Sequence, residues 1–186
     1  MDKTRRRFVA AAGMAALGAS LGAGRSAADA AAAPRGARRK SALGDTTSAV
    51  LGAAGDILLP GAKAAGIVDY VGTQLALPAH RQVLMIKYLI TPPFRDFYIA
   101  GLGALEAHAL ARLRVSFARA RAADAQQVID DLRNNKLAGW SGPPQPFLHF
   151  VLRNDALDVV YGTRTGFNRL GVPYMAHIEP PSDWPS

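Results

Sequence analysis

Apolar residues recur at helical spacing through most of the chain, and this period restricts the fold more than any other feature. Val50, Leu51 and Ala54 fall on one face of a helix that begins near Asp45 and ends at Pro60. Apolar spacing and proline or glycine breaks predict helices over residues 45–59, 62–77, 78–90, 94–115, 122–134 and 146–160. In the third helix we expect four residues to face inward: Val83, Leu84, Ile86 and Leu89. The pattern predicts an all-α fold, a small domain of about five to six helices.

The chain contains no cysteine. Disulfides, iron–sulfur clusters and covalently attached c-type haem are therefore excluded, because each needs thiols. Roughly 145 residues follow the N-terminal segments, which is enough for one domain that buries about two-thirds of its unfolded surface. We expect the domain to be held together by its apolar core alone.

Residues 1–30 have the parts of a twin-arginine signal peptide in their usual order. Thr4 is followed by Arg5, Arg6, Arg7 and Phe8, and then by a weakly apolar stretch rich in alanine and glycine. Arg5, Arg6 and Phe8 are the residues that the twin-arginine translocase would read. We expect export to the periplasm. Residues 31–44 form a basic, flexible tether, and residues 45–186 form the helical domain.

The basic charge lies mainly in the N-terminal segments. The whole chain has a formal net charge of +8, but residues 1–40 contain nine of the 22 basic and two of the 14 acidic residues. The remainder has 13 basic and 12 acidic residues. A nucleic-acid partner, which a high isoelectric point would suggest, is therefore not expected for the folded domain.

The last 26 residues, 161–186, have a different composition from the helical region. They are rich in glycine, proline and aromatic residues and show neither a helical nor a strand period. The segment is too aromatic for a disordered tail. We expect an irregular arm that packs either on this domain or on a partner. The residues that could supply interface energy are Tyr161, Arg169, Tyr174, Met175, His177 and Trp184.

Catalytic and metal-binding patterns are scarce. The four histidines are not spaced as metal ligands on a helix, and no Gly-x-Ser-x-Gly nucleophile elbow occurs. Asp155 and Asp158 are interpreted as solvated surface residues, and Asp56 is most simply a residue that makes a helix-end hydrogen bond or a surface ion pair. No catalytic, cofactor-binding or metal-ligating residue is therefore nominated in this chain.

Three stretches resemble a known family. The segment from Gly55 to Val71 (GDILLPGAKAAGIVDYV) resembles the opening motif of the gluconate 2-dehydrogenase subunit 3 family. The segment from Phe147 to Gly162 is similar to the family's second region, a helix that ends in Tyr-Gly. The stretch 170–181 is similar to the tail of one branch, whereas other members have a Gly-Trp-Lys-x-Ile-Gly-Phe-Pro stretch at this place.

The resemblance implies a non-catalytic small subunit without a cofactor of its own. Its partner would be an FAD-containing large subunit of the glucose–methanol–choline type, which oxidises a sugar or an alcohol. A membrane cytochrome c often accepts the electrons, and the complex would then be associated with the membrane. In such complexes the small subunit often bears the only twin-arginine signal, so it would escort the folded flavoprotein through export and stabilise it.

A second hypothesis stays open at this stage. The sequence Tyr174-Met175-Ala176-His177 could offer a methionine or histidine to a haem iron, as in a stand-alone periplasmic haem- or ligand-binding protein. The competing interpretation is that these residues pack or hydrogen-bond across an interface. A Soret band from the purified chain would distinguish the two hypotheses.

Overall fold

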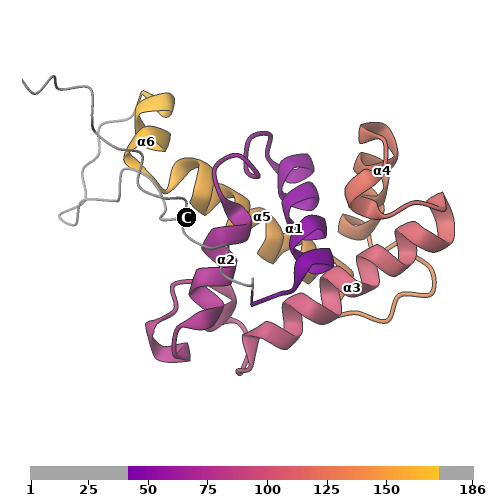
Figure 1. Ribbon diagram of the computed structural model, residues 1–186, viewed down its shortest axis with the longest axis horizontal. Coiled ribbons are helices and arrows are strands. Elements are labelled where there is room, and N and C mark those ends of the chain that lie inside the picture. The colour runs from indigo at the N-terminus through magenta and orange to yellow at the C-terminus, as the bar shows by residue number, and fades with distance from the viewer. Residues whose placement is uncertain (1–41, 172–186) are drawn as a thin grey trace, which may run out of the picture. The chain divides into compact units, whose positions relative to one another are not determined.

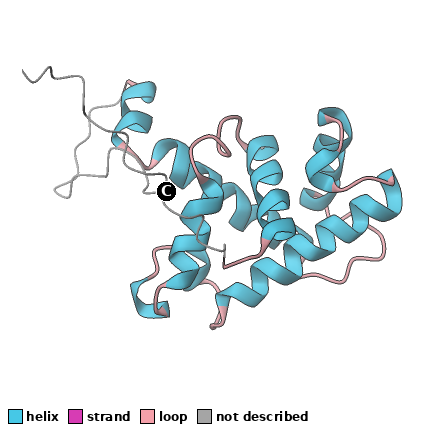
Figure 2. Ribbon diagram, in the orientation of Figure 1, coloured by secondary structure: helices cyan, strands magenta, loops and turns pink. Residues whose placement is uncertain are grey.

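The structure is a computed structural model that describes residues 42–171. Six α-helices and three short 3₁₀ helices make up these residues, with no strand among them (Figures 1 and 2). The α-helices are α1 (Asp45–Leu58), α2 (Ile67–Ala76), α3 (Phe94–Leu113), α4 (Ala122–Arg133), α5 (Gln145–Tyr161) and α6 (Arg164–Leu170). The predicted all-α class is therefore confirmed. The leader residues lie outside the described part, and so do residues 172–186 of the predicted arm.

Helix α5 is the centre of the domain. It packs against α1, α2, α4 and α6, and it also contacts the 3₁₀ helix at Met85–Tyr88. Leu148, Val151, Leu152 and Ala156 on α5 are fully buried, because neighbouring helices cover more than one of its faces. A helix placed in this way loses the polar stripe that a surface helix would show.

Helices α3 and α5 approach each other closely at a glycine. A Cβ atom at Gly101 would lie 2.6 Å from Cδ1 of Leu148, which is fully buried on α5. Glycine in a helix interior usually weakens the helix relative to alanine. Instead α3 continues without interruption for 20 residues, and Gly101 provides the space for packing.

The turn between α1 and α2 replaces the first part of the helix predicted over 62–77. Gly61 and Gly66 have φ angles of 94° and 89°, in the left-handed region that favours glycine. Oδ1 of Asp56 accepts hydrogen bonds from the backbone N–H groups of Gly61 (3.0 Å) and Lys63 (3.1 Å). The predicted helix-end role of Asp56 is confirmed, and α2 begins only at Ile67.

The helix predicted over 78–90 is also wrong. This segment contains two 3₁₀ turns, Ala79–Arg81 and Met85–Tyr88. Leu84 and Ile86 are buried as predicted, but Val83 and Leu89 are exposed. The side chains of Gln74, Gln82 and Lys87 form hydrogen bonds with backbone groups here, in place of the backbone hydrogen bonds of an α-helix. Apolar residues at helical spacing therefore do not share one face.

The two ends of the described domain differ from the predicted boundaries. Leu43, assigned to the tether, is buried in the core. Residues 164–170, assigned to the irregular arm, form α6. The hydroxyl of Thr163 accepts a hydrogen bond from the N–H of Gly166 (3.1 Å), and Gly171 ends the helix at a φ of 63°. Helix α6 has only seven residues, too few to show a clear apolar period, so the sequence pattern did not predict it.

Candidate functional site

Two aspartates of α5 lie inside the domain, contrary to the prediction of solvated surface residues. The hydroxyl of Tyr98 on α3 donates to Oδ2 of Asp155 at 2.8 Å. The hydroxyl of Tyr70 on α2 donates to Oδ2 of Asp158 at 3.2 Å. Asp155 is fully buried and Asp158 is partly buried. The pairs connect α5 to α3 and α2, and the bonded residues are 57 and 88 positions apart in the chain, respectively.

Burial controls the ionisation of these groups. Burial, with a smaller contribution from the nearby Asp158, raises the pKa of Asp155 to about 8, although the hydrogen bond from Tyr98 acts in the opposite direction. Burial also raises the pKa of Asp158, again opposed by its tyrosine partner. The pKa of each tyrosine is raised, first by burial and then by the carboxyl groups. Asp155 is therefore mainly a neutral acid at pH 7, and the two pairs act as buried polar links between helices.

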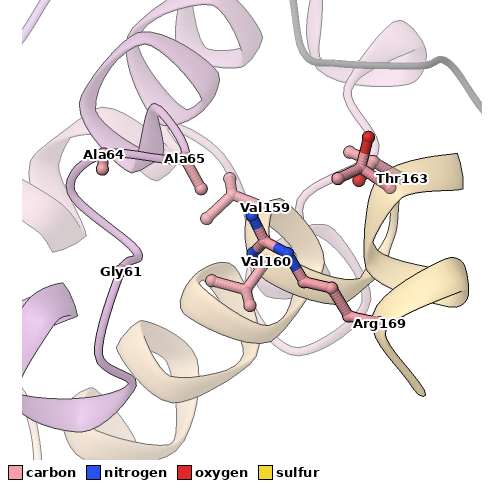
Figure 3. Close-up of a pocket in the computed structure, with 8 residues that line it drawn as sticks. Gly61, Ala64, Ala65, Val159, Val160, Thr163 and Arg169 are labelled. Carbon is pink, nitrogen blue, oxygen red and sulfur yellow. The ribbon is translucent and has the colours of Figure 1, made fainter.

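A small pocket lies beside these links, between the α1–α2 turn and the end of α5 (Figure 3). Its volume is about 230 Å³. The lining residues are Gly61, Ala64, Ala65, Val159, Val160, Thr163, Thr165 and Arg169. The lining thus combines small apolar groups with two threonine hydroxyls and one guanidinium. Neither Asp155 nor Asp158 lines it, so the buried acids do not face this space.

Arg169 supplies the positive charge at the pocket. It is exposed on α6, and in Figure 3 its side chain extends from that helix across Val159 and Val160. The ion pairs found within residues 42–171 do not include Arg169. Its guanidinium could therefore bind a carboxylate presented at the pocket.

The size and lining of the pocket favour a side chain over a cofactor. Small-molecule and cofactor sites usually have volumes of about 300–1,000 Å³, larger than this pocket. Three lining residues come from the first segment of family resemblance, 55–71, and two come from the second, 147–162. The pocket is thus the place where two family-like segments meet.

Metal-ligating groups do not converge in the described part of the chain. Among residues 42–171, no three histidine, aspartate or glutamate side chains are placed to hold a metal ion. In the same range, no helix is both long and apolar enough to cross a membrane. The histidine of the haem hypothesis, His177, lies outside the described residues.

The structure places two of the six predicted interface residues. Tyr161 is partly buried and packs against the core, so its ring is not fully available to a partner. Arg169 is exposed and lines the pocket. The remaining predictions fall outside the described residues: Tyr174, Met175, His177 and Trp184 in the arm, and Arg5, Arg6 and Phe8 in the leader.

Sequence reasoning missed the buried Tyr–Asp pairs and the pocket. Gly61 and the alanines that follow it up to Ala65 were visible as part of a family-like motif, which was the available signal for the pocket. For the Tyr–Asp pairs there was no local signal, because each pair joins distant parts of the chain.

The comparisons with known proteins agree with the resemblance seen in the sequence. The family model for gluconate 2-dehydrogenase subunit 3 matches residues 45–177. No curated protein and no solved structure matched the chain in the same comparisons. The matched range contains all six α-helices and both segments that line the pocket. The chain therefore belongs to the gluconate 2-dehydrogenase subunit 3 family.

Proposed function

We propose that this chain is the non-catalytic small subunit of a periplasmic FAD-dependent sugar or alcohol dehydrogenase. The observation that carries the proposal is the family match over residues 45–177, since the family is that of a subunit of a gluconate 2-dehydrogenase complex. The partner is a flavoprotein of the glucose–methanol–choline type, and a membrane cytochrome c takes the electrons onward. The flavin belongs to the partner, and nucleic acid plays no part.

The leader supports a role in export. Arg5, Arg6 and Phe8 occupy the positions of the twin-arginine address, and that route carries folded proteins. A flavoprotein that takes up FAD in the cytoplasm needs such a route. The small subunit would therefore escort its partner through the translocase and then stabilise it in the periplasm.

The pocket supports a binding role for the end of the domain that carries α6. Its volume suits one protruding side chain, and Arg169 suits a side chain with a carboxylate nearby. The arm residues Tyr174, Met175, His177 and Trp184 follow α6 in the chain, and we propose that they extend this contact. Deletion of residues 172–186 should then weaken the complex without loss of helical circular dichroism.

The test is affinity purification of the tagged chain from the periplasm of its native host, followed by an absorbance spectrum. Co-elution with a flavoprotein, and loss of both proteins from the periplasm on changing Arg5 and Arg6 to lysine, would support the proposal. A colourless chain recovered alone would contradict it. A Soret band without flavin would favour the stand-alone haem protein instead.

A further inference from the structure

Four apolar side chains are exposed together in the segment between α2 and α3. Val83, Met85, Tyr88 and Leu89 have relative exposures of 55, 37, 73 and 43%. We call these four residues the apolar ledge. They are half of the large hydrophobic residues that are exposed within residues 42–171, although they occupy only seven consecutive positions. Apolar residues scattered singly on a surface need no explanation, whereas a contiguous exposed patch marks an interaction site, and these four residues lie close together in the chain.

Hydrogen bonds from side chains hold the ledge in place. The N–H of Val83 donates to Oε1 of Gln74 at 2.9 Å. Nε2 of Gln82 donates to the carbonyl of Leu77 at 2.8 Å, and Nζ of Lys87 donates to the carbonyl of Gln82 at 3.1 Å. These bonds tie the irregular segment to the end of α2 and to itself. A surface ordered in advance loses less conformational entropy when it binds.

The ledge alternates with buried residues along the chain. Leu84 and Ile86 enter the core, whereas Val83 and Met85 on either side point to solvent. The inward residues anchor the segment, so exposure of the ledge is a consequence of the fold and not of local unfolding. Substitutions on the outward side should therefore leave the core intact.

The segment that carries the ledge is basic in sequence. Arg81, Lys87 and Arg95 are basic, and between residues 79 and 95 there is no acidic residue. The first acidic side chain beyond the segment is Asp96. The two salt bridges found within residues 42–171 both involve aspartates of α4 and not these cations. Lys87 lies 5.6 Å from the ring centre of Tyr88, within the range of a cation–π contact.

We propose that the apolar ledge docks on the flavoprotein subunit, at an apolar patch bordered by aspartate and glutamate side chains. This inference rests on the proposed function, which supplies the partner. The apolar ledge provides an interface core of a tyrosine, a methionine and two aliphatic residues, and the basic residues provide a rim that a carboxylate-bearing surface complements. A second copy of this chain would place two basic rims against each other, which opposes self-association through the ledge.

The ledge is separate from the pocket. Figure 1 shows the 79–90 segment at one end of α2, whereas the turn that lines the pocket leads into the other end. A helix of ten residues is about 15 Å long. The pocket and the ledge therefore lie toward opposite ends of α2, as two separate contact regions of the proposed interface.

The experiment uses the full tagged chain in its native host and measures flavin per chain in the purified material. Tyr88→Glu and Val83→Glu place a carboxylate within the apolar ledge, against the apolar patch proposed on the partner. We expect each to lower flavin recovery at least about tenfold, the effect of losing one strong interface contact. Tyr88→Phe keeps the ring and should retain recovery. Leu110→Glu is the matched control, because Leu110 is exposed on α3 outside the ledge.

Loss of flavin in the ledge variants, with unchanged circular dichroism and normal recovery in the control, would support docking through the ledge. Normal flavin recovery in all variants would overturn docking through the ledge and leave the proposed function standing. Absence of flavin with the wild-type chain overturns both.

Two other occupants have their own readouts. Sedimentation with phosphatidylglycerol vesicles that is lost in Tyr88→Glu, with flavin recovery unchanged, would assign the ledge to a lipid surface and overturn the proposal. Dimerisation of the wild-type chain that is lost in Tyr88→Glu, again with flavin recovery unchanged, would assign it to a second copy.

Discussion

Replacing Asp155 with asparagine should remove a pH dependence of stability that originates inside the domain. Burial raises the pKa of Asp155 to about 8 in the folded protein, whereas an aspartate in an unfolded chain titrates near about 3.9. Between these values the folded state binds one more proton than the unfolded state. The stability contributed by the neutral acid is therefore complete below about pH 4 and is lost as the pH rises toward about 8.

The magnitude follows from the same linkage. The free energy of unfolding should fall by about 1.4 kcal/mol per pH unit while only the folded state holds the proton. From pH 5 to pH 7 the loss that Asp155 causes is about 3 kcal/mol. Asparagine has nearly the shape of the neutral acid and can still accept from Tyr98, but it does not titrate. The free energy of unfolding of the wild type minus that of Asp155→Asn should therefore fall by about 3 kcal/mol from pH 5 to pH 7.

The assay is urea unfolding followed by circular dichroism at several pH values, with linear extrapolation to water. Other titrating groups, including Asp158, are present in both proteins and largely cancel in the difference. Asp124→Asn is the control. Its pKa is lowered, first by the hydrogen bond from Arg121, so its contribution is lost only at acidic pH and its removal should not change the slope between pH 5 and pH 7. Equal pH slopes for wild type and Asp155→Asn would refute the reasoning, because Asp155 would then be ionised in the fold.

Three further substitutions test the packing, with the same unfolding assay. Gly101→Ala should destabilise the protein by about 1–3 kcal/mol, because the new methyl group overlaps the side chain of Leu148. This effect should exceed the gain from alanine's higher helix propensity. Unchanged stability would mean that the side chain of Leu148 moves aside. Gln145→Ala should cost about 2 kcal/mol, since its amide bonds both the N–H and the carbonyl of buried Leu137; a loss well below this would show that water replaces the amide. Asp56→Ala should cost about 1 kcal/mol by removing both hydrogen bonds that close the α1–α2 turn, and a neutral effect would show that its two glycines hold the turn alone.

Much of the fold could be predicted because its signals are local. The apolar period, together with prolines at Pro60, Pro92 and Pro146, placed α1, α3, α4 and α5 within about two residues of their observed ends. Proline and glycine act through their own backbone geometry, so their effect needs no distant partner. The family was equally visible, because its motifs are short and continuous in the chain.

The helix predicted over 78–90 is wrong because side-chain hydrogen bonds compete with the helical backbone pattern. The apolar positions of 78–90 fit a helix, but Gln74 and Lys87 satisfy backbone groups through their side chains and leave a turn-rich segment with an exposed apolar ledge. The spacing alone contains no information about this competition. Prediction of the ledge therefore required the packed structure.

The sequence by itself determined the helical class, the main helices and the family, and it predicts an export leader. Only the tertiary structure decided that Asp155 is buried, that Asp158 is partly buried, and that the motif around Gly61 forms a pocket with the end of α5. The physical reason is the central position of α5. Its neighbours come from across the whole domain, and a residue's burial and pKa depend on which helices cover it and not on the residues beside it in the chain.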